Sequence, residues 1–236
     1  FIGRFVKGDL QYFVTIGSFI DFYYNYQAEN REIIEQELAL STSQINTLFQ
    51  QLNQSVYSDE RYYTYKFIDR NCTTMVVDKI NGILGKEYIK SETSKLSYRE
   101  ILYPYMTDFY MKLGIQLIFG AKVDQPATRL FLPYEFEKAI SKTKVNNVFL
   151  EKTNKTILQV TKPEVPFNWL NSIYSLITVL LILAILNKKW IKISYFIFAG
   201  LLGLFFSLVG LYSLHEEILW NYNILLFNPL LLVFAW

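Results

Sequence analysis

The sequence contains very little cysteine and histidine, with one residue of each among 236. The single cysteine, Cys72, excludes an internal disulfide framework and a cysteine-rich zinc site. The single histidine, His215, excludes a metal centre that is built from several histidines. We therefore expect neither a metal nor a cofactor, and Cys72 is either a buried filler residue or a reactive thiol.

The sequence also lacks an excess of charge of one sign. Its 23 basic and 21 acidic residues are interspersed and give a formal net charge of +2. Nucleic-acid binding requires a one-sided basic surface, so we exclude nucleic acid as the main partner. With 52% hydrophobic residues, the chain is too apolar to be disordered.

Both ends of the sequence lack the usual features of a complete protein. The chain has no initiator methionine and no signal peptide with a charged region before an apolar core, and it runs apolar to Trp236. We therefore expect a protein that is incomplete at both its N-terminus and its C-terminus.

Charge is almost absent from the last third of the sequence. Three apolar runs lie at about 169–187, 193–214 and 218–236. A helix of roughly 20 residues, at about 1.5 Å per residue, crosses a hydrocarbon core of about 30 Å. We therefore predict a transmembrane region over 166–236 with these three runs as helices. A very hydrophobic soluble core is the alternative.

The loops between these runs differ in charge. The first loop carries three lysines within 188–192, and the second carries His215 and two glutamates. Positive loops stay in the cytoplasm, so residues 1–165 and His215 are expected on the outer side. Polar residues are costly in lipid, and those of the third run should face a protein interior or a cavity. These residues are Asn221, Asn223 and Asn228.

Residues 1–165 have the size of one ordinary domain and mix helix and strand signals, which indicates an α+β fold. The segment from Leu10 to Phe19 is β-prone, and 62–67 is aromatic-rich and extended. A capping box at Ser41 predicts a helix over about 42–55. A second helix is predicted over 72–84, ended by Gly85. Its expected buried side consists of Met75, Val76, Ile80, Ile83 and Leu84.

The start of this second helix is a candidate site for thiol chemistry. Asn71 is the predicted N-cap, so Cys72 falls in the first turn, where free N–H groups and the helix dipole favour a thiolate. Only the thiolate attacks a carbonyl, and the same N–H groups can hold the oxyanion. His215 is the one histidine that can serve as a base, although a structural or capping role is the alternative. Asp78 is interpreted as a packing or salt-bridge residue.

Short motifs follow one another along the whole chain. They are Gly8-Asp9-Leu10-Gln11-Tyr12, Glu29-Asn30-Arg31, Glu35-Gln36-Glu37-Leu38, Tyr63 to Phe67, Asp69-Arg70-Asn71-Cys72-Thr73, Ser97-Tyr98-Arg99, Leu113-Gly114-Ile115, Phe119-Gly120 and Leu130-Phe131-Leu132-Pro133. This ordered set resembles the bacterial Lnb N-terminal periplasmic domain family. His215, together with Asn221, Asn223, Asn228 and Pro229, is similar to the membrane region attached to that domain.

The resemblance implies a lipoprotein N-acyltransferase of the Bacteroidota inner membrane, a multi-pass protein with its N-terminal domain in the periplasm. The implied fold is a permuted papain-like (NlpC-type) thiol domain followed by transmembrane helices. Cys72 would take an acyl chain from a phospholipid as a thioester and pass it to the N-terminal amine of a diacylglyceryl lipoprotein. Asn71 and His215 are the supporting residues.

The same resemblance marks two departures. The Phe-Gly-His-Ser segment that supplies the family's catalytic base is expected upstream of Phe1. Gln116 stands where the family usually has an aspartate after Gly-Ile, which argues against an acidic role at that position.

Two other functions fit the same residues. A membrane-tethered cysteine peptidase or amidase that acts on cell-wall peptides would use the same nucleophile in a water-accessible cleft. A non-catalytic membrane interaction module would leave Cys72 merely packed. An apolar groove from Cys72 to the bilayer favours lipid substrates, whereas a polar open cleft favours peptides.

Overall fold

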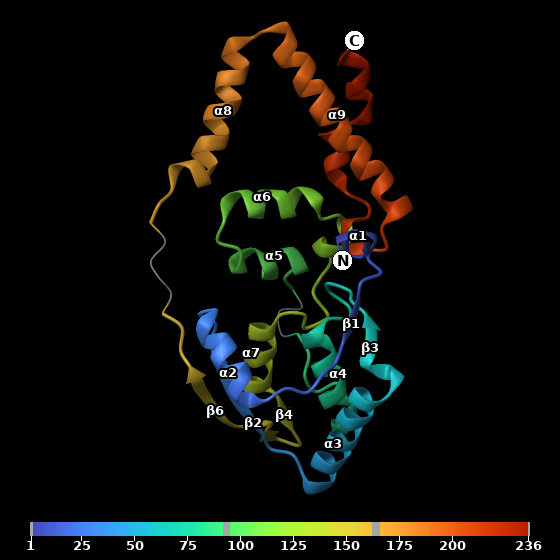
Figure 1. The fold of residues 1–236 in the computed structure, drawn as a ribbon, viewed down its shortest axis with the longest axis vertical. Helices are drawn as coiled ribbons and strands as arrows, with labels where there is room; N and C mark the ends of the chain where they lie inside the picture. The colour runs from blue at the N-terminus through green and yellow to red at the C-terminus, as the bar shows by residue number, and fades with distance from the viewer. Residues whose placement is uncertain (1, 92–94, 162–165, 236) are drawn as a thin grey trace. The chain divides into compact units, whose positions relative to one another are not determined.

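The computed structural model describes residues 2–91, 95–161 and 166–235, which form two compact units (Figure 1). The elements are mixed helix and sheet, in agreement with the predicted α+β class. The first unit contains Asp9–Thr93 and Thr128–Glu164. The second contains Ile2–Gly8, Ser94–Ala127 and Val165–Trp236.

The strands of the first unit form three antiparallel pairs. They are β1 (Gln11–Phe13) with β3 (Tyr62–Thr64), β2 (Ile33–Leu38) with β6 (Glu151–Leu158), and β4 (Lys144–Val145) with β5 (Val148–Phe149). In the first pair, Tyr12 lies opposite Tyr63. This register brings the N-terminal strand against the segment that leads to Cys72.

The helices of the first unit are α2 (Phe19–Ala28), α3 (Thr42–Tyr57), α4 (Cys72–Leu84) and α7 (Pro133–Lys142), with a short 3-10 turn at Asp59–Arg61. The two predicted helices are confirmed as α3 and α4. Local signals set their ends: Ser41 forms the expected capping box, and Gly85 adopts a left-handed conformation with φ of 76° at the end of α4.

The β-prone segment before residue 20 is mostly not a strand. The strand β1 ends at Phe13, and α2 begins at Phe19. Ser18 adopts an extended conformation, and its side chain accepts a hydrogen bond from the Ile20 N–H. This N-cap starts a helix because it satisfies one of the backbone N–H groups that have no acceptor in the first turn of a helix.

The core of the first unit lies between α4, α7 and the strand segments beside them. Its buried members are Val77, Ile80, Ile89, Leu130, Ala139, Ile140 and Leu150. On α4 the prediction was wrong for Val76, which is 46% exposed, whereas Val77 is buried. One residue turns a helix by about 100°, and Val77 shares the face of Thr74 and Ile80 at helical spacing.

The second unit is helical. Its α-helices are α1 (Ile2–Lys7), α5 (Tyr98–Leu102), α6 (Phe109–Ile118), α8 (Ile173–Leu186) and α9 (Lys189–Tyr212). Its 3-10 segments are η2 (Tyr103–Tyr105), η3 (Ala121–Asp124), η4 (Trp169–Asn171), η5 (Glu216–Ile218), η6 (Tyr222–Leu225) and η7 (Pro229–Ala235).

This division differs from the predicted boundary between 1–165 and 166–236. The segment Ser94–Ala127 belongs to the second unit, together with the apolar C-terminal region. Backbone bonds hold it there: the Gly120 N–H donates to the Glu217 carbonyl at 2.8 Å, and the Ala121 N–H donates to the Leu219 carbonyl at 3.2 Å. Such long-range pairing leaves no local sequence signal.

Among the described residues, α9 is long and apolar enough to cross a membrane by its length and composition. The helix α8 has 14 residues, fewer than the predicted run at 169–187. The prediction of a continuous helix over 218–236 is wrong, because 3-10 segments replace it and bend by 44° between Leu225 and Pro229. The described chain therefore offers one candidate span, or two if this bent pair is one broken span.

The physical reason for the break lies in the polar residues of the run. The side chain of Asn221 accepts the Asn223 N–H, and the side chain of Asn228 accepts the Leu230 N–H, each at 2.9 Å. Pro229 has no N–H to give to a helix. These local bonds compete with a regular α-helix.

Candidate functional site

Cys72 is the first residue of α4, and its side chain is exposed. Asn71 is the N-cap, as predicted. Its side-chain oxygen accepts the Thr74 N–H at 3.0 Å, and its own N–H donates to the Thr74 hydroxyl at 2.9 Å. This reciprocal pair is a capping box, so the first turn is fixed by local bonds.

The Asn71 side chain also connects the helix start to the rest of the first unit. Its amide nitrogen donates to the carbonyls of Phe67 at 2.8 Å and Phe131 at 2.9 Å. Asn71 is only 5% exposed, so these donors would be costly to leave unbonded. The Asn71 carbonyl accepts the Met75 N–H and the Thr74 hydroxyl, each at 3.1 Å, so every polar group of Asn71 takes part in bonds that fix the residue before Cys72.

The first turn of α4 provides donors beside the thiol. The N–H groups of Cys72 and Thr73 have no intrahelical acceptor, because no turn precedes them. The cap takes up the Thr74 N–H and leaves these two for another partner. A tetrahedral oxyanion that forms on a carbonyl attacked by the thiolate is such a partner.

Tyr63 lies close to Cys72 and was not identified from the sequence. It is buried in β3, its ring centroid is 6.1 Å from that of Tyr12, and the Arg70 guanidinium lies 5.7 Å from its centroid. Burial raises the pKa of the Tyr63 phenol above its ordinary value, negative charge on Cys72 raises it further, and Arg70 opposes the shift. Tyr63 thus stays protonated near the thiol and remains a hydrogen-bond donor.

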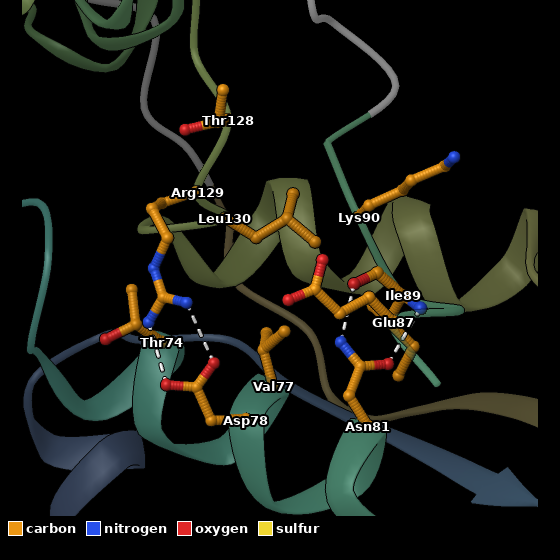
Figure 2. A pocket seen from close by; sticks show the side chains of 10 residues that line it. All are labelled: Thr74, Val77, Asp78, Asn81, Glu87, Ile89, Lys90, Thr128, Arg129 and Leu130. Atoms are coloured by element: carbon orange, nitrogen blue, oxygen red, sulfur yellow. Dashed lines mark hydrogen bonds and ion pairs between the residues drawn. The ribbon is translucent and has the colours of Figure 1, made fainter. Parts of the chain in front are cut away.

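A bidentate ion pair joins α4 to a neighbouring segment. The Arg129 guanidinium contacts both carboxylate oxygens of Asp78, at 2.9 and 2.8 Å, and also donates to the Asp69 carbonyl at 3.2 Å (Figure 2). The predicted salt-bridge role of Asp78 is confirmed. Both side chains are substantially exposed, so the pair contributes geometry more than stability.

A pocket of about 220 Å³ opens on the same helix. It is lined by Thr74, Val77, Asp78, Asn81, Glu87, Ile89, Lys90, Thr128, Arg129 and Leu130 (Figure 2). Cys72 does not line this pocket, although Thr74 belongs to the same helical turn. Its lining is mixed apolar and charged, so it does not by itself separate lipid from peptide substrates.

His215 belongs to the second unit, in the link between α9 and η5. Its Nδ1 lies 3.7 Å from Oε2 of Glu217, a buried residue. The backbone before it is fixed by a 2.7 Å bond from the Leu214 N–H to the Lys7 carbonyl. A nearby carboxylate orients an imidazole, which suits either a structural pair or a base.

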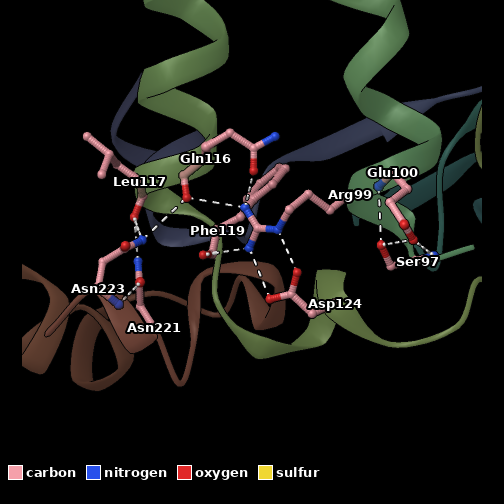
Figure 3. A network of polar contacts seen from close by, with 9 residues as sticks. All are labelled: Ser97, Arg99, Glu100, Gln116, Leu117, Phe119, Asp124, Asn221 and Asn223. Atoms are coloured by element: carbon pink, nitrogen blue, oxygen red, sulfur yellow. Dashed lines mark hydrogen bonds and ion pairs between the residues drawn. The ribbon is translucent and has the colours of Figure 1, made fainter. Parts of the chain in front are cut away.

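The carbonyls at the end of α6 are satisfied by side chains from elsewhere in the second unit. Arg99 donates to the carbonyls of Gln116 and Phe119, each at 3.2 Å, and to the Gln116 side chain at 2.5 Å (Figure 3). It also holds both carboxylate oxygens of Asp124, at 2.6 and 3.1 Å. The side-chain oxygen of Gln116 therefore accepts a hydrogen bond from Arg99. This contact does not require an acidic residue at position 116.

The expectation for the asparagines of the last apolar run is confirmed for two of them. Asn221 is buried, and its amide donates to the Leu117 carbonyl at 2.6 Å and the Ile118 carbonyl at 3.0 Å (Figure 3). Asn223 donates to the Leu117 carbonyl at 3.1 Å. A helix leaves its last four carbonyls without intrahelical donors, and these amides replace them.

We expect Arg99→Met to loosen this contact. The substitution keeps an unbranched apolar side chain and removes the five guanidinium donors, so carbonyls of α6 lose partners at a cost of about 2 kcal/mol. Hydrogen exchange of the Gly120 and Ala121 amides should then become faster by roughly 30-fold. Lys138→Met removes an exposed ion pair and should leave these rates unchanged. Equal rates in both variants would contradict the assigned role.

A comparison with protein-family models gave a match that includes these site residues. Residues 1–105 match the model described as the Lnb N-terminal periplasmic domain. Neither the search of curated proteins nor the search of solved structures gave a match. The matched range contains Asn71, Cys72 and Tyr63. Over residues 1–105, this chain is therefore similar to the Lnb N-terminal periplasmic domain family.

Proposed function

We propose that this protein is a thiol-dependent lipoprotein N-acyltransferase of the bacterial inner membrane, with Cys72 as its nucleophile. The observation that carries the proposal is the exposed thiol at a helix start that Asn71 fixes by hydrogen bonds, within an Lnb periplasmic domain. We further propose that the first unit contains a permuted papain-like arrangement, in which a cysteine at a helix N-terminus is the attacking group.

The first step forms a thioester. The Cys72 sulfur attacks the ester carbonyl of a phospholipid, and the N–H groups of Cys72 and Thr73 stabilise the oxyanion. The C–O bond then breaks, a lysophospholipid leaves with a proton from the base, and the acyl chain remains on sulfur. The resemblance to the family implies that its Phe-Gly-His-Ser segment supplies this base.

The second step forms an amide. The N-terminal amine of a diacylglyceryl lipoprotein attacks the thioester carbonyl, the C–S bond breaks, and the amine proton passes to the base while the thiolate is restored. Both substrates are confined to the membrane, so a tether such as α9 supports the reaction by keeping the domain near them.

A reconstituted reaction tests this function against the cell-wall alternative. The complete protein in vesicles receives a phospholipid with an isotope-labelled acyl chain and a diacylglyceryl lipopeptide with a free amine. We expect the label on the lipopeptide amine, and none with the Cys72→Ala variant. Release of muropeptide fragments without acyl transfer would replace the proposal by the amidase, and neither product would support the non-catalytic module.

A further inference from the structure

The pocket on α4 is built by local bonds. Gly85 turns the chain at the end of α4, and the Asn81 amide then holds residue 89 through two bonds: it donates to the Ile89 carbonyl at 2.8 Å and accepts the Ile89 N–H at 2.9 Å. The segment 86–90 is thereby held along α4. Thr74 lies at the opposite end of the pocket lining, on the face of α4 that also carries Val77 and Asn81.

The charges of this pocket are not equivalent. Val77, Ile89 and Leu130 are buried and give it an apolar floor. The Glu87 carboxylate points into the space beside Val77 and Leu130, whereas the Lys90 side chain points away (Figure 2). Neither charge has a hydrogen-bond or ion-pair partner among the described residues, in contrast to Asp78, which is held by Arg129.

We propose that this pocket binds a protonated primary amine, with Glu87 as its counter-ion. An ammonium group donates up to three hydrogen bonds, and the Glu87 carboxylate offers it charged acceptor oxygens. A volume of about 220 Å³ suits a small head group and not an acyl chain. The proposal rests on the proposed function, in which the acceptor, and a phospholipid donor with an ethanolamine head group, each carry a primary amine.

This chemistry has two sources in the proposed reaction. One is the N-terminal amine of the lipoprotein acceptor, and the other is the ethanolamine head group of a phospholipid donor. The first source makes Glu87 a determinant of acceptor recognition, and the second makes it a determinant of donor recognition.

Binding to the inactive Cys72→Ala protein in nanodiscs separates these sources. The probes are a fluorescent diacylglyceryl dipeptide with a free amine, the same dipeptide N-acetylated, and short-chain phosphatidylethanolamine and phosphatidylglycerol. For an acceptor site, the free-amine dipeptide should bind about ten-fold more tightly than the acetylated one. For a head-group site, phosphatidylethanolamine should bind about ten-fold more tightly than phosphatidylglycerol.

In either case we introduce Glu87→Gln into the Cys72→Ala protein and expect it to abolish the preference for the amine probe. The matched Lys90→Gln variant in the same background should retain that preference. If both variants retain it, or if the parent protein shows no preference for either amine, the inference is overturned. Because no turnover is measured, binding can succeed even if the reconstituted acyl transfer fails. Such a result would reject the acyltransferase and leave the amine site standing.

Discussion

Cells whose only copy of this protein carries Cys72→Ala are expected to accumulate lipoproteins with two acyl chains and a free N-terminus. The substitution removes the sulfur that carries the acyl group, so the reaction rate should fall by roughly a thousand-fold or more. Mass spectrometry of lipoprotein N-terminal peptides measures the ratio of diacylated to triacylated forms directly.

The matched control for this experiment is Val76→Ala. Val76 lies one turn further along the same helix, and its side chain is also exposed. Its truncation should leave the lipoproteins triacylated, because it removes no reacting atom and little buried surface. Triacylated lipoproteins in the Cys72→Ala strain would reject the nucleophile assignment, provided that no second enzyme acts in the strain, which deletion of the whole gene establishes.

The second large effect is expected from Asn71→Ala. This substitution removes the N-cap and leaves the buried carbonyls of Phe67 and Phe131 without the amide that now reaches them. Loss of the cap costs about 1 kcal/mol, and the lost buried bonds bring the total decrease in unfolding free energy to about 3 kcal/mol. Urea unfolding of the detergent-solubilised protein measures this change in unfolding free energy.

Ser41→Ala is the control for Asn71→Ala. Ser41 caps α3 with the same box geometry, but it is exposed and makes no bond to a distant segment. We expect its removal to cost about 1 kcal/mol. If the two substitutions destabilise the protein equally, the long-range bonds of Asn71 do not hold the helix start as described.

Sequence reasoning succeeded where the signals were local. The bounds of α4 at Cys72 and Leu84 follow from an asparagine cap and a terminal glycine, and both act within a few residues. The salt-bridge role of Asp78 and the partnered asparagines of the last run were also predicted. Their partners, such as Arg129 for Asp78, were not predicted, because they lie tens of residues away along the chain.

The larger differences arise from contacts that are distant in sequence. The segment Ser94–Ala127 joins the second unit through backbone bonds to residues 217–220, which no periodicity reveals. The run at 218–236 is apolar enough for a helix, but the bonds made by Asn221 and Asn228 redirect its backbone. Hydropathy alone reveals neither the backbone bonds between distant segments nor the redirection of the chain by asparagine side chains.

The candidate site was predicted only in part. Cys72 and Asn71 were identified because a capped helix start with a thiol is a recognisable pattern. Tyr63 could have been singled out by its inward position in an alternating strand, although not as a neighbour of Cys72. Glu87 has no such signal, because an exposed glutamate after a helix is ordinarily a solvated residue.

The most direct measurement is the mass of the peptide that contains Cys72 after the complete protein is mixed with phospholipid and no amine acceptor. We predict an added acyl chain on this peptide that hydroxylamine removes, as expected for a thioester, and that disappears when the lipopeptide acceptor is supplied. An unmodified Cys72 in a preparation that still acylates lipoproteins would contradict the account.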